Sequence, residues 1–336
     1  MAEEIKQSMS GFQIVGTLKE IGLSREGIKE RELGKKGSGI KETCNSISKP
    51  NKKDAALAVE VNGQVIEVDL PFGVFEKKIN KDGQIVDNPD YKALETVIDT
   101  YEVGKTRVKI DGNVIANEYV SNKDGKFHTY APKIKLFKIT STNVPDTDLA
   151  EGTITGILTQ HSKEVFNETE TGRIKVRIMS FDYSGNMYPV DIVVPKMGVT
   201  DDGEEFELAD AFEDYFKTND SVLFNVTAVA VQHGSTQKKS VGLGRSSNRV
   251  SGWVEQEIQL VGGSKIVADE TEDEYDPNLK DYFITPEMVK KGNDAREVMI
   301  AKKEAEKASE STTTTTVKGS SASATSNPFG GSNPFA

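Results

Sequence analysis

The stretch NPDYKALETVIDTYEVGKTRVKI, residues 88–110, decides the fold of the first half of the chain. Asn88 can cap a helix, and Pro89 suits the first helical position. The apolar residues that follow recur at helical spacing on one face: Tyr91, Leu94, Ile98 and Tyr101. We expect Gly104 to end this helix. Residues 107–117 then alternate between polar and apolar side chains, which predicts a strand directly after the helix.

Strands are predicted on both sides of this stretch. Upstream, residues 56–61 and 64–70 alternate around Asn62-Gly63, a pair that suits a type I′ hairpin turn. Further strands are predicted before the hairpin and after the helix, at residues 12–21, 40–47 and 127–141, with charged, Gly-rich sequence over 22–38. The first unit therefore reads as strands, one helix and two closing strands.

The second half repeats this order. Strands are predicted at residues 152–160, 173–183, 187–194, 221–232 and 250–260, with a helix over 205–217 between the third and the fourth. Two short echoes link the halves: Gly16-Thr17-Leu18 resembles Gly152-Thr153-Ile154, and Val108-Lys109-Ile110 resembles Val222-Leu223-Phe224.

Three strands, a helix and two strands are the order of the five-stranded OB barrel. We therefore predict a mainly β protein with two OB-fold barrels in tandem, each with one helix, followed by a C-terminal helix and a disordered tail. A pair of small β-sandwiches is the alternative. The predicted segments are an N-terminal tail, two barrels, an acidic linker with a helix, and a tail: residues 1–10, 11–147, 148–264, 265–310 and 311–336.

The formal charge of −11 argues against nucleic acid at first sight. The acids, however, are concentrated. Residues 201–220 hold nine acids and one base, and residues 265–310 hold thirteen acids and eight bases. Outside these segments the bases cluster, with ten between Lys19 and Lys53 against five acids. The net charge therefore describes mainly one helix and one linker.

Several classes of protein are not expected. No apolar run is long enough for a membrane span, and the N-terminus shows no secretory signal, so we expect a cytoplasmic protein. A single cysteine, Cys44, allows neither an internal disulfide nor a Cys-based zinc site. Gly-rich segments lack a Walker or Rossmann frame. We therefore expect no enzyme, no cofactor and no metal.

The strand over residues 173–183 carries the strongest functional signal. Its even positions are apolar and suit a barrel interior, whereas its odd positions present cations, a methionine and aromatic rings: Arg173, Lys175, Arg177, Met179, Phe181 and Tyr183. Phosphates need cations and splayed bases need rings on which to stack, so this face predicts a single-stranded nucleic-acid site. Tyr188 on the next strand extends it. Alternatively, Phe181 and Tyr183 turn inward after a bulge near Met179.

A similar pattern is present in the first unit. Lys133, Lys135 and Phe137 share one face of their strand, and Arg107 and Lys109 face opposite to Val108 and Ile110.

Trp253, the only tryptophan, could stack on a base or belong to the core. Two basic segments correspond to the loops that flank an OB binding face. Their candidate phosphate ligands are Arg25, Lys29, Arg31, Lys35, Lys36 and Lys41 in the first, and Lys238, Lys239, Arg245 and Arg249 in the second.

The last 26 residues are rich in Ser, Thr, Gly and Asn and end in a duplicated motif, Asn327-Pro328-Phe329 and Asn333-Pro334-Phe335. Such a segment buries too little apolar surface to fold. A phenylalanine in disordered polar sequence has no core to join, so the two motifs predict docking of a partner protein.

These features resemble a known family. The Gly-Thr-Leu strand at Gly16, the basic segment 25–41 and the acidic linker after Gly262-Gly263-Ser264 are similar to those of phage single-stranded DNA-binding or OB-fold replication-accessory proteins from phages of Gram-positive bacteria. The resemblance covers about residues 11–290. The tail is similar to that of bacterial single-stranded DNA-binding proteins, in which a terminal Pro-Phe recruits partner enzymes.

The sequence thus predicts a non-enzymatic protein that binds single-stranded DNA, or RNA, with little sequence preference. The resemblance implies a role in phage replication or recombination within the bacterial cytoplasm, with replication or recombination proteins recruited by the tail. The alternative is a structural or adaptor module, because OB barrels also serve in protein assemblies.

Overall fold

The computed structural model describes residues 6–34, 38–51, 54–166, 168–182, 184–200, 202–239 and 247–315. The chain divides into two compact units. The larger consists of Met1–Asn117 with Thr129–Arg296 and contains the two barrels; the smaller consists of Glu118–His128 with Glu297–Ala336. Each is described by itself below.

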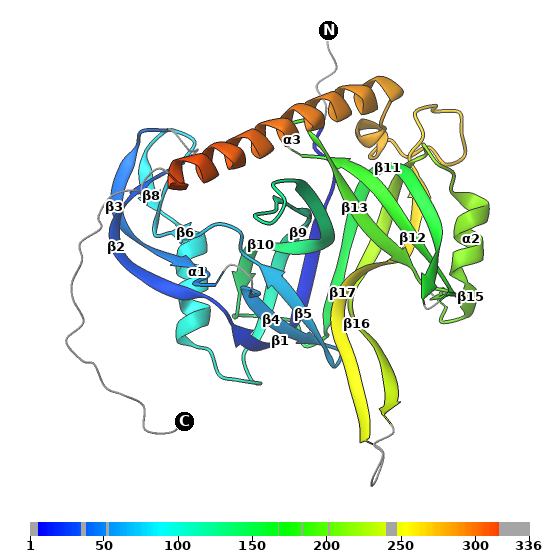
Figure 1. Ribbon diagram of the computed structural model, residues 1–336, viewed down its shortest axis with the longest axis horizontal. Helices are drawn as coiled ribbons and strands as arrows, with labels where there is room; N and C mark the ends of the chain where they lie inside the picture. The colour runs from blue at the N-terminus through cyan, green and yellow to red at the C-terminus, as the bar shows by residue number, and fades with distance from the viewer. Residues whose placement is uncertain are drawn as a thin grey trace, which may run out of the picture. The chain divides into compact units, whose positions relative to one another are not determined.

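The first half of the chain forms a closed five-stranded barrel (Figure 1). Its strands are β1 (Gly11–Ile21), β4 (Leu57–Val61), β5 (Gln64–Asp69), β9 (Arg107–Val120) and β10 (Phe127–Thr140). They lie in the order β1-β4-β5-β10-β9, and β1 also pairs with β9, which closes the barrel. The pairing of β5 with β10 is parallel, as the OB order requires. The OB-fold prediction is therefore confirmed for this half.

Local sequence explains the two sharpest features of this barrel. Asn62 and Gly63 have φ of 50° and 78°, so the turn between β4 and β5 has the positive φ angles of type I′. The helix α1 (Pro89–Asp99) begins as predicted, because the Asn88 side chain accepts a hydrogen bond from the Asp90 N–H. It ends at Asp99 rather than near Gly104, so Tyr101 lies beyond the helix.

The second half forms a closed barrel of the same topology. Its strands are β11 (Leu149–Phe166), β12 (Thr169–Phe181), β13 (Met187–Val194), β16 (Ser221–Lys239) and β17 (Ser247–Lys265). They lie in the order β12-β13-β17-β16-β11, and β11 closes the barrel on β12. Again the pairing of the third strand with the fifth, β13 with β17, is parallel. The predicted division at residues 147 and 148 stays a prediction; it falls between β10 and β11.

In the structure, the residue of the second barrel that corresponds to Gly16 lies four positions later than the first sequence echo predicts. Gly16 pairs with Val108, and Gly156, not Gly152, pairs with Val222. The register then shifts directly after Leu18 in one barrel and directly after Leu158 in the other. The matching segments are therefore Gly16–Leu18 and residues 156–158, whereas the second echo, which pairs Val108 with Val222, is confirmed.

Insertions account for the remaining strands of the first barrel. The basic segment is not an irregular loop but a hairpin of β2 (Ser24–Glu32) and β3 (Lys41–Ser48), which pairs with β6 (Val74–Phe75). A small hairpin of β7 (Lys77–Ile79) and β8 (Ile85–Asp87) precedes α1. The hairpin does lie between the first and second barrel strands, as the OB interpretation predicts.

The second barrel also departs from the predicted boundaries. Residues 205–207 belong to β15 (Glu205–Glu207), which pairs with β14 (Met197–Val199), so the helix α2 (Leu208–Tyr215) begins three residues later than predicted. The strands β16 and β17 extend into the predicted loop 234–252, as far as Lys239 and from Ser247 onward, and form a long hairpin that projects from the barrel (Figure 1).

The two barrels share one hydrophobic core and a direct strand pairing. Phe12 pairs with Gly152 and Val15 with Leu149, so the first strands of the two barrels run antiparallel. A buried cluster extends through both barrels, from Ile14 and Val59 to Ile178 and Phe224. Polar contacts join them as well: the Ala230 N–H donates to Gln64 Oε1 at 2.9 Å, and Gln256 exchanges hydrogen bonds with the backbone of Glu67.

The C-terminal helix α3 (Pro286–Thr315) follows a short 3-10 helix, η1 (Lys280–Tyr282). Its first turns pack on the second barrel, where Met288 and Val289 contact Ile157, Phe181 and Met187. In the smaller unit, Glu304 Oε1 accepts a hydrogen bond of 2.9 Å from the Phe127 N–H. None of the helices in the described part of the chain is both long and apolar enough to cross a membrane.

Candidate nucleic-acid interface

The predicted cationic face of the second barrel exists on β12. Ile174, Val176 and Ile178 are buried in the barrel, so the odd positions lie on the outer side. Arg173 and Arg177 are half-buried and Lys175 is exposed. The alternation that predicted this face therefore holds from Arg173 to Arg177.

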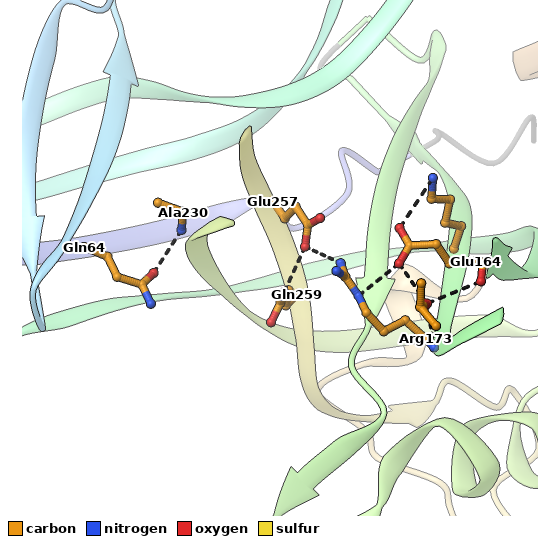
Figure 2. A network of polar contacts seen from close by, with 8 residues as sticks. Gln64, Glu164, Arg173, Ala230, Glu257 and Gln259 are labelled. Carbon is orange, nitrogen blue, oxygen red and sulfur yellow. Dashed lines mark hydrogen bonds and ion pairs between the residues drawn. The ribbon is translucent and has the colours of Figure 1, made fainter. Parts of the chain in front are cut away.

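All three cations are engaged by carboxylates. Arg173 lies between Glu164 and Glu257 (Figure 2), with 3.4 Å from its Nε to Glu164 Oε2. Lys175 Nζ lies 3.5 Å from Glu164 Oε1. The guanidinium of Arg177 makes a bidentate pair with Asp191, at 2.6 Å and 2.9 Å. These acids lie on β11, β13 and β17, so strands of the barrel itself supply the carboxylates.

A groove of about 410 Å³ lies on this face. Strands β11, β12, β13 and β17 supply most of its wall, and Ala131 and Pro132 of β10 supply the side nearest the first barrel. Its charged lining residues are Lys175, Arg177, Glu164, Asp191, Glu255 and Glu257. The groove thus occupies the outer side of strands two and three, where OB barrels bind oligonucleotides.

The aromatic part of the predicted face is wrong for Phe181. Its ring is 1% exposed and packs with Ile157, Met187 and Ile284. The cause is the cover above it: α3 packs on this end of the barrel, and the Phe181 N–H donates to Ser8 Oγ of the N-terminal segment. Phe181 is core, as in the alternative interpretation.

Of the other two predicted rings of this face, only Tyr188 belongs to the described residues. Tyr188 is half-buried against the core, and burial raises the pKa of its phenol. Tyr183 lies outside the described residues. A stacking platform on β12 and β13 is therefore not supported by the side chains that the structure describes.

The first barrel presents its predicted residues more openly. On β10, Ile134 and Leu136 are buried, Lys133 and Lys135 are half-buried, and Phe137 is 71% exposed. Lys133 Nζ lies 3.1 Å from Asp69 Oδ2. Lys135 makes no ion pair among the described residues; its Nζ lies 5.8 Å from the centroid of the Phe72 ring.

The predicted β9 cations differ in their surroundings. Arg107 Nη1 lies 2.9 Å from Asp148 Oδ1, and its guanidinium also donates to the carbonyls of Pro145 and Asp146. Arg107 thus holds the connection between the barrels. Lys109 faces away from the buried Val108 and Ile110, as predicted, and lies beside β1.

The first basic segment is largely paired within itself. Arg25 contacts Asp99 of α1 at 2.6 Å, and Arg31 and Lys29 contact Glu26. Lys41 Nζ lies 2.9 Å from Glu30 Oε1. Lys35 and Lys36 lie outside the described residues. Lys29, Arg31 and Lys41 are thus paired within the β2–β3 hairpin, whereas Arg25 joins the hairpin to α1.

The second basic segment lies in the outer half of the β16–β17 hairpin. Lys238, Lys239 and Arg249 are on its strands, but their side chains are outside the described part, and Arg245 lies outside the described residues altogether. Trp253 on β17 is 58% exposed, so it is not a core residue. Its exposure is compatible with base stacking.

The remaining sequence predictions concern the C-terminal motifs and metal binding. The partner-docking motifs Asn327-Pro328-Phe329 and Asn333-Pro334-Phe335 lie outside the described residues. Among the residues that are described, no group of three or more His, Cys, Asp or Glu side chains could hold a metal ion.

Comparison with models of protein families identifies the family of this chain. The family model YorF matches residues 10–315, which include both barrels and α3. The chain belongs to the YorF family. No curated protein matches this YorF family member.

Solved structures with a similar fold include single-stranded DNA-binding proteins. The wild-type protein from Thermus aquaticus is 10% identical with a TM-score of 0.41, covering 80% of this chain and 97% of that chain. A deletion mutant of the Thermus protein is 11% identical with a TM-score of 0.41, covering 80% and 99%. A replication protein A heterotrimer bound to single-stranded DNA is 10% identical with a TM-score of 0.16, covering 68% and 46%. Likenesses this weak support no conclusion about what the YorF family member binds.

Sequence reasoning missed two sets of residues at these surfaces. The carboxylates Glu164, Asp191 and Glu257 come from three different strands, so no local motif reveals them. Phe72 is 75% exposed in the segment Pro71-Phe72-Gly73 between β5 and β6. A phenylalanine between proline and glycine in a turn was a signal that could have been used.

Proposed function

We propose that this protein binds single-stranded DNA along the outer face of β12, β13 and β17 in the second barrel. The observation that carries the proposal is the groove of about 410 Å³ on that face, with Lys175 and Arg177 in its wall. It lies between the β11–β12 and β16–β17 hairpins, which correspond to the two loops that flank an OB binding face.

The ion pairs of the groove define how a strand would bind. Phosphates have to replace Asp191 at Arg177 and Glu164 at Lys175, because each cation already has a carboxylate partner. The exchange substitutes one anion for another. The resulting affinity is modest and falls with salt, as expected where phosphate contacts dominate. In this role the acidic lining limits binding to ligands that bring several phosphates at once.

A salt titration tests the proposal. The full chain and a fluorescein-labelled oligothymidylate are mixed, and anisotropy gives the dissociation constant between 50 and 200 mM salt. For single strands the log–log slope is about −0.7 per neutralised phosphate, so four to six contacts predict roughly −3 to −4. No binding at 50 mM salt contradicts the proposal and favours the alternative, a structural or adaptor module.

Charge variants make the test specific to the groove. Lys175→Ala should weaken binding and reduce the slope by about 0.7, because one phosphate contact is lost. Asp191→Asn should strengthen binding, because Arg177 is released from its carboxylate. Lys105→Ala is the matched control: Lys105 is also paired with a glutamate, at 2.9 Å, but lies in the turn between α1 and β9. Weaker binding by Asp191→Asn would mean that Asp191 positions Arg177.

The biological setting is part of the proposal. We infer a non-enzymatic protein of phage replication or recombination that acts in the bacterial cytoplasm, and a tail whose paired Asn-Pro-Phe motifs recruit replication or recombination proteins. The sequence resemblance and the doubled motif support these inferences. The exposed Trp253 and the basic β16–β17 hairpin extend the proposed DNA contact beyond the groove.

A further inference from the structure

The first barrel carries a second, larger groove of about 820 Å³. It is formed by the end of β10, the segment from Leu70 to Phe75, the β2–β3 insertion and the start of α1. Two phenyl rings line it, Phe72 with 75% and Phe137 with 71% of its surface exposed. Both rank among the most exposed large apolar side chains of the described residues.

Packing does not account for these two rings. Burying a phenylalanine side chain is worth about 1.5–3 kcal/mol, and this stabilisation is forgone at both positions. On β10 the inward position beside Phe137 is filled by Leu136, which is 6% exposed. Two large rings at one groove therefore indicate a ligand with flat or apolar groups.

The charges around the rings differ from those of the second barrel. Lys135 Nζ lies 5.8 Å from the centre of the Phe72 ring, and Lys138 follows Phe137 directly in β10. Neither lysine forms an ion pair within the described part of the chain, whereas Arg173, Lys175 and Arg177 are all paired. A ring beside an uncompensated cation matches the alternation of base and phosphate in a single strand.

The outward row of β10 connects the two grooves. Ala131 lines the groove of the second barrel, Lys133 and Gln256 line a smaller groove of about 250 Å³ beside it, and Phe137 lines the groove of the first barrel. Because side chains alternate along a strand, residues 131, 133, 135 and 137 point outward together and span roughly 20 Å. Both grooves therefore lie along one strand of the larger unit.

We propose that the groove of Phe72 and Phe137 is a base-stacking site that holds the continuation of a strand bound on the second barrel. This inference rests on the proposed function, and it adds a division of roles. The second barrel exchanges carboxylates for phosphates, and the first barrel stacks bases on two rings. The stacking contribution is insensitive to salt, because phenyl rings release no counterions.

Two substitutions test the site in the full chain. Phe72→Ala and Phe137→Ala should each weaken oligothymidylate binding, roughly five- to hundredfold, with an unchanged salt slope. Phe137→Leu retains an apolar side chain and should also lose affinity. Val103→Ala is the control, because Val103 is 73% exposed in the turn between α1 and β9. Thermal melts should show all four variants folded, since the substituted side chains are exposed.

A fluorescence reporter gives a second readout. In the Trp253→Phe background, Phe137→Trp places the only tryptophan in the groove, and stacking of a base should quench its emission on addition of oligothymidylate. The stacking site is overturned if the wild-type chain binds and Phe72→Ala and Phe137→Ala bind with the same affinity. It is also overturned if the reporter variant binds without quenching of its tryptophan. Either result leaves the proposed function standing. Absence of binding by the wild-type chain overturns both.

Discussion

At the scale of single residues, carboxylates determine where cations are available. In the second barrel, ion pairs join the cations to Glu164, Asp191 and Glu257. In the first barrel, Lys135 and Lys138 have no carboxylate partner among the described residues. Exposed pairs contribute little to stability, so the pair between Arg177 and Asp191 is not expected to hold the fold together. The position of the carboxylates, rather than the number of lysines and arginines, therefore decides which cations of each face are paired.

The carboxyl of Asp148 predicts a dependence of stability on pH. A hydrogen bond from the Asn62 N–H, together with Arg107, lowers the pKa of the Asp148 carboxyl. A lowered folded pKa stabilises the protein above the unfolded value of about 3.9, and this stabilisation is lost as pH falls through the folded pKa. Asp148→Asn should therefore cost about 1–2 kcal/mol at pH 7 and progressively less in acid.

Urea unfolding at several pH values between 2.5 and 7 measures this difference. Asp146→Asn, at an exposed position in the same connection, is the control and should leave the free energy of unfolding at pH 7 nearly unchanged. A cost for Asp148→Asn that does not change with pH would show that shape, and not charge, makes Asp148 matter.

The sequence predicts side chains well where a neighbour along the strand decides their environment. The alternation on β10 placed Phe137 outside and Leu136 inside, and both are observed. The same reasoning failed at Phe181, because the cover over that ring comes from Ser8 and from α3, which are distant in sequence. Strand periodicity identifies the two faces of a strand but cannot show what packs on them.

At the scale of elements, insertions and extensions distinguish the two barrels. The first barrel has the β2–β3 hairpin between its first two strands, and the second has the long β16–β17 hairpin between its last two. Both coincide with basic sequence that reads as loop. Glycine and charge signal a departure from the barrel, yet they do not show that the inserted residues pair with one another.

The helix α3 lies close to the second barrel at Gly292. A Cβ at Gly292 would lie 2.2 Å from Met187 Cγ and 2.6 Å from Phe181 Cε1. Gly292→Ala should therefore destabilise the protein by about 1–3 kcal/mol through overpacking, although alanine favours a helix more than glycine does.

Asn293→Ala, at an exposed position next to Gly292, is the matched control and should be neutral or slightly stabilising. Denaturant unfolding compares the two variants. If Gly292→Ala stabilises the protein as much as Asn293→Ala does, α3 does not rest on Met187 as tightly as this contact requires.

At the scale of the whole molecule, the two barrels behave as one body within the larger unit. They share a buried cluster, a strand pairing and the hydrogen bonds of Gln64 and Gln256. The order of elements predicted two barrels correctly. It could not predict their joint core, because the alternation that defines an inner face in each barrel says nothing about contacts between barrels.

Joint packing predicts a single unfolding transition. Trp253 fluorescence reports on the second barrel and far-ultraviolet circular dichroism on both, so their denaturation curves should coincide. Two separated transitions would contradict a shared core and would indicate that each barrel is stable alone.

The pairing of β1 with β11 has a consequence during synthesis. Residues Phe12 to Val15 lie between β9 on one side and β11 on the other, so the first barrel can close while one edge of β1 still lacks its neighbour. An uncovered strand edge is a template for unwanted pairing with other chains. Ribosomes add about 5–20 residues per second, so this edge stays unpaired for about one to two seconds between the completion of β10 and the synthesis of the β11 residues that pair with it. Nascent chains that stall between the barrels should be the aggregation-prone species of this protein.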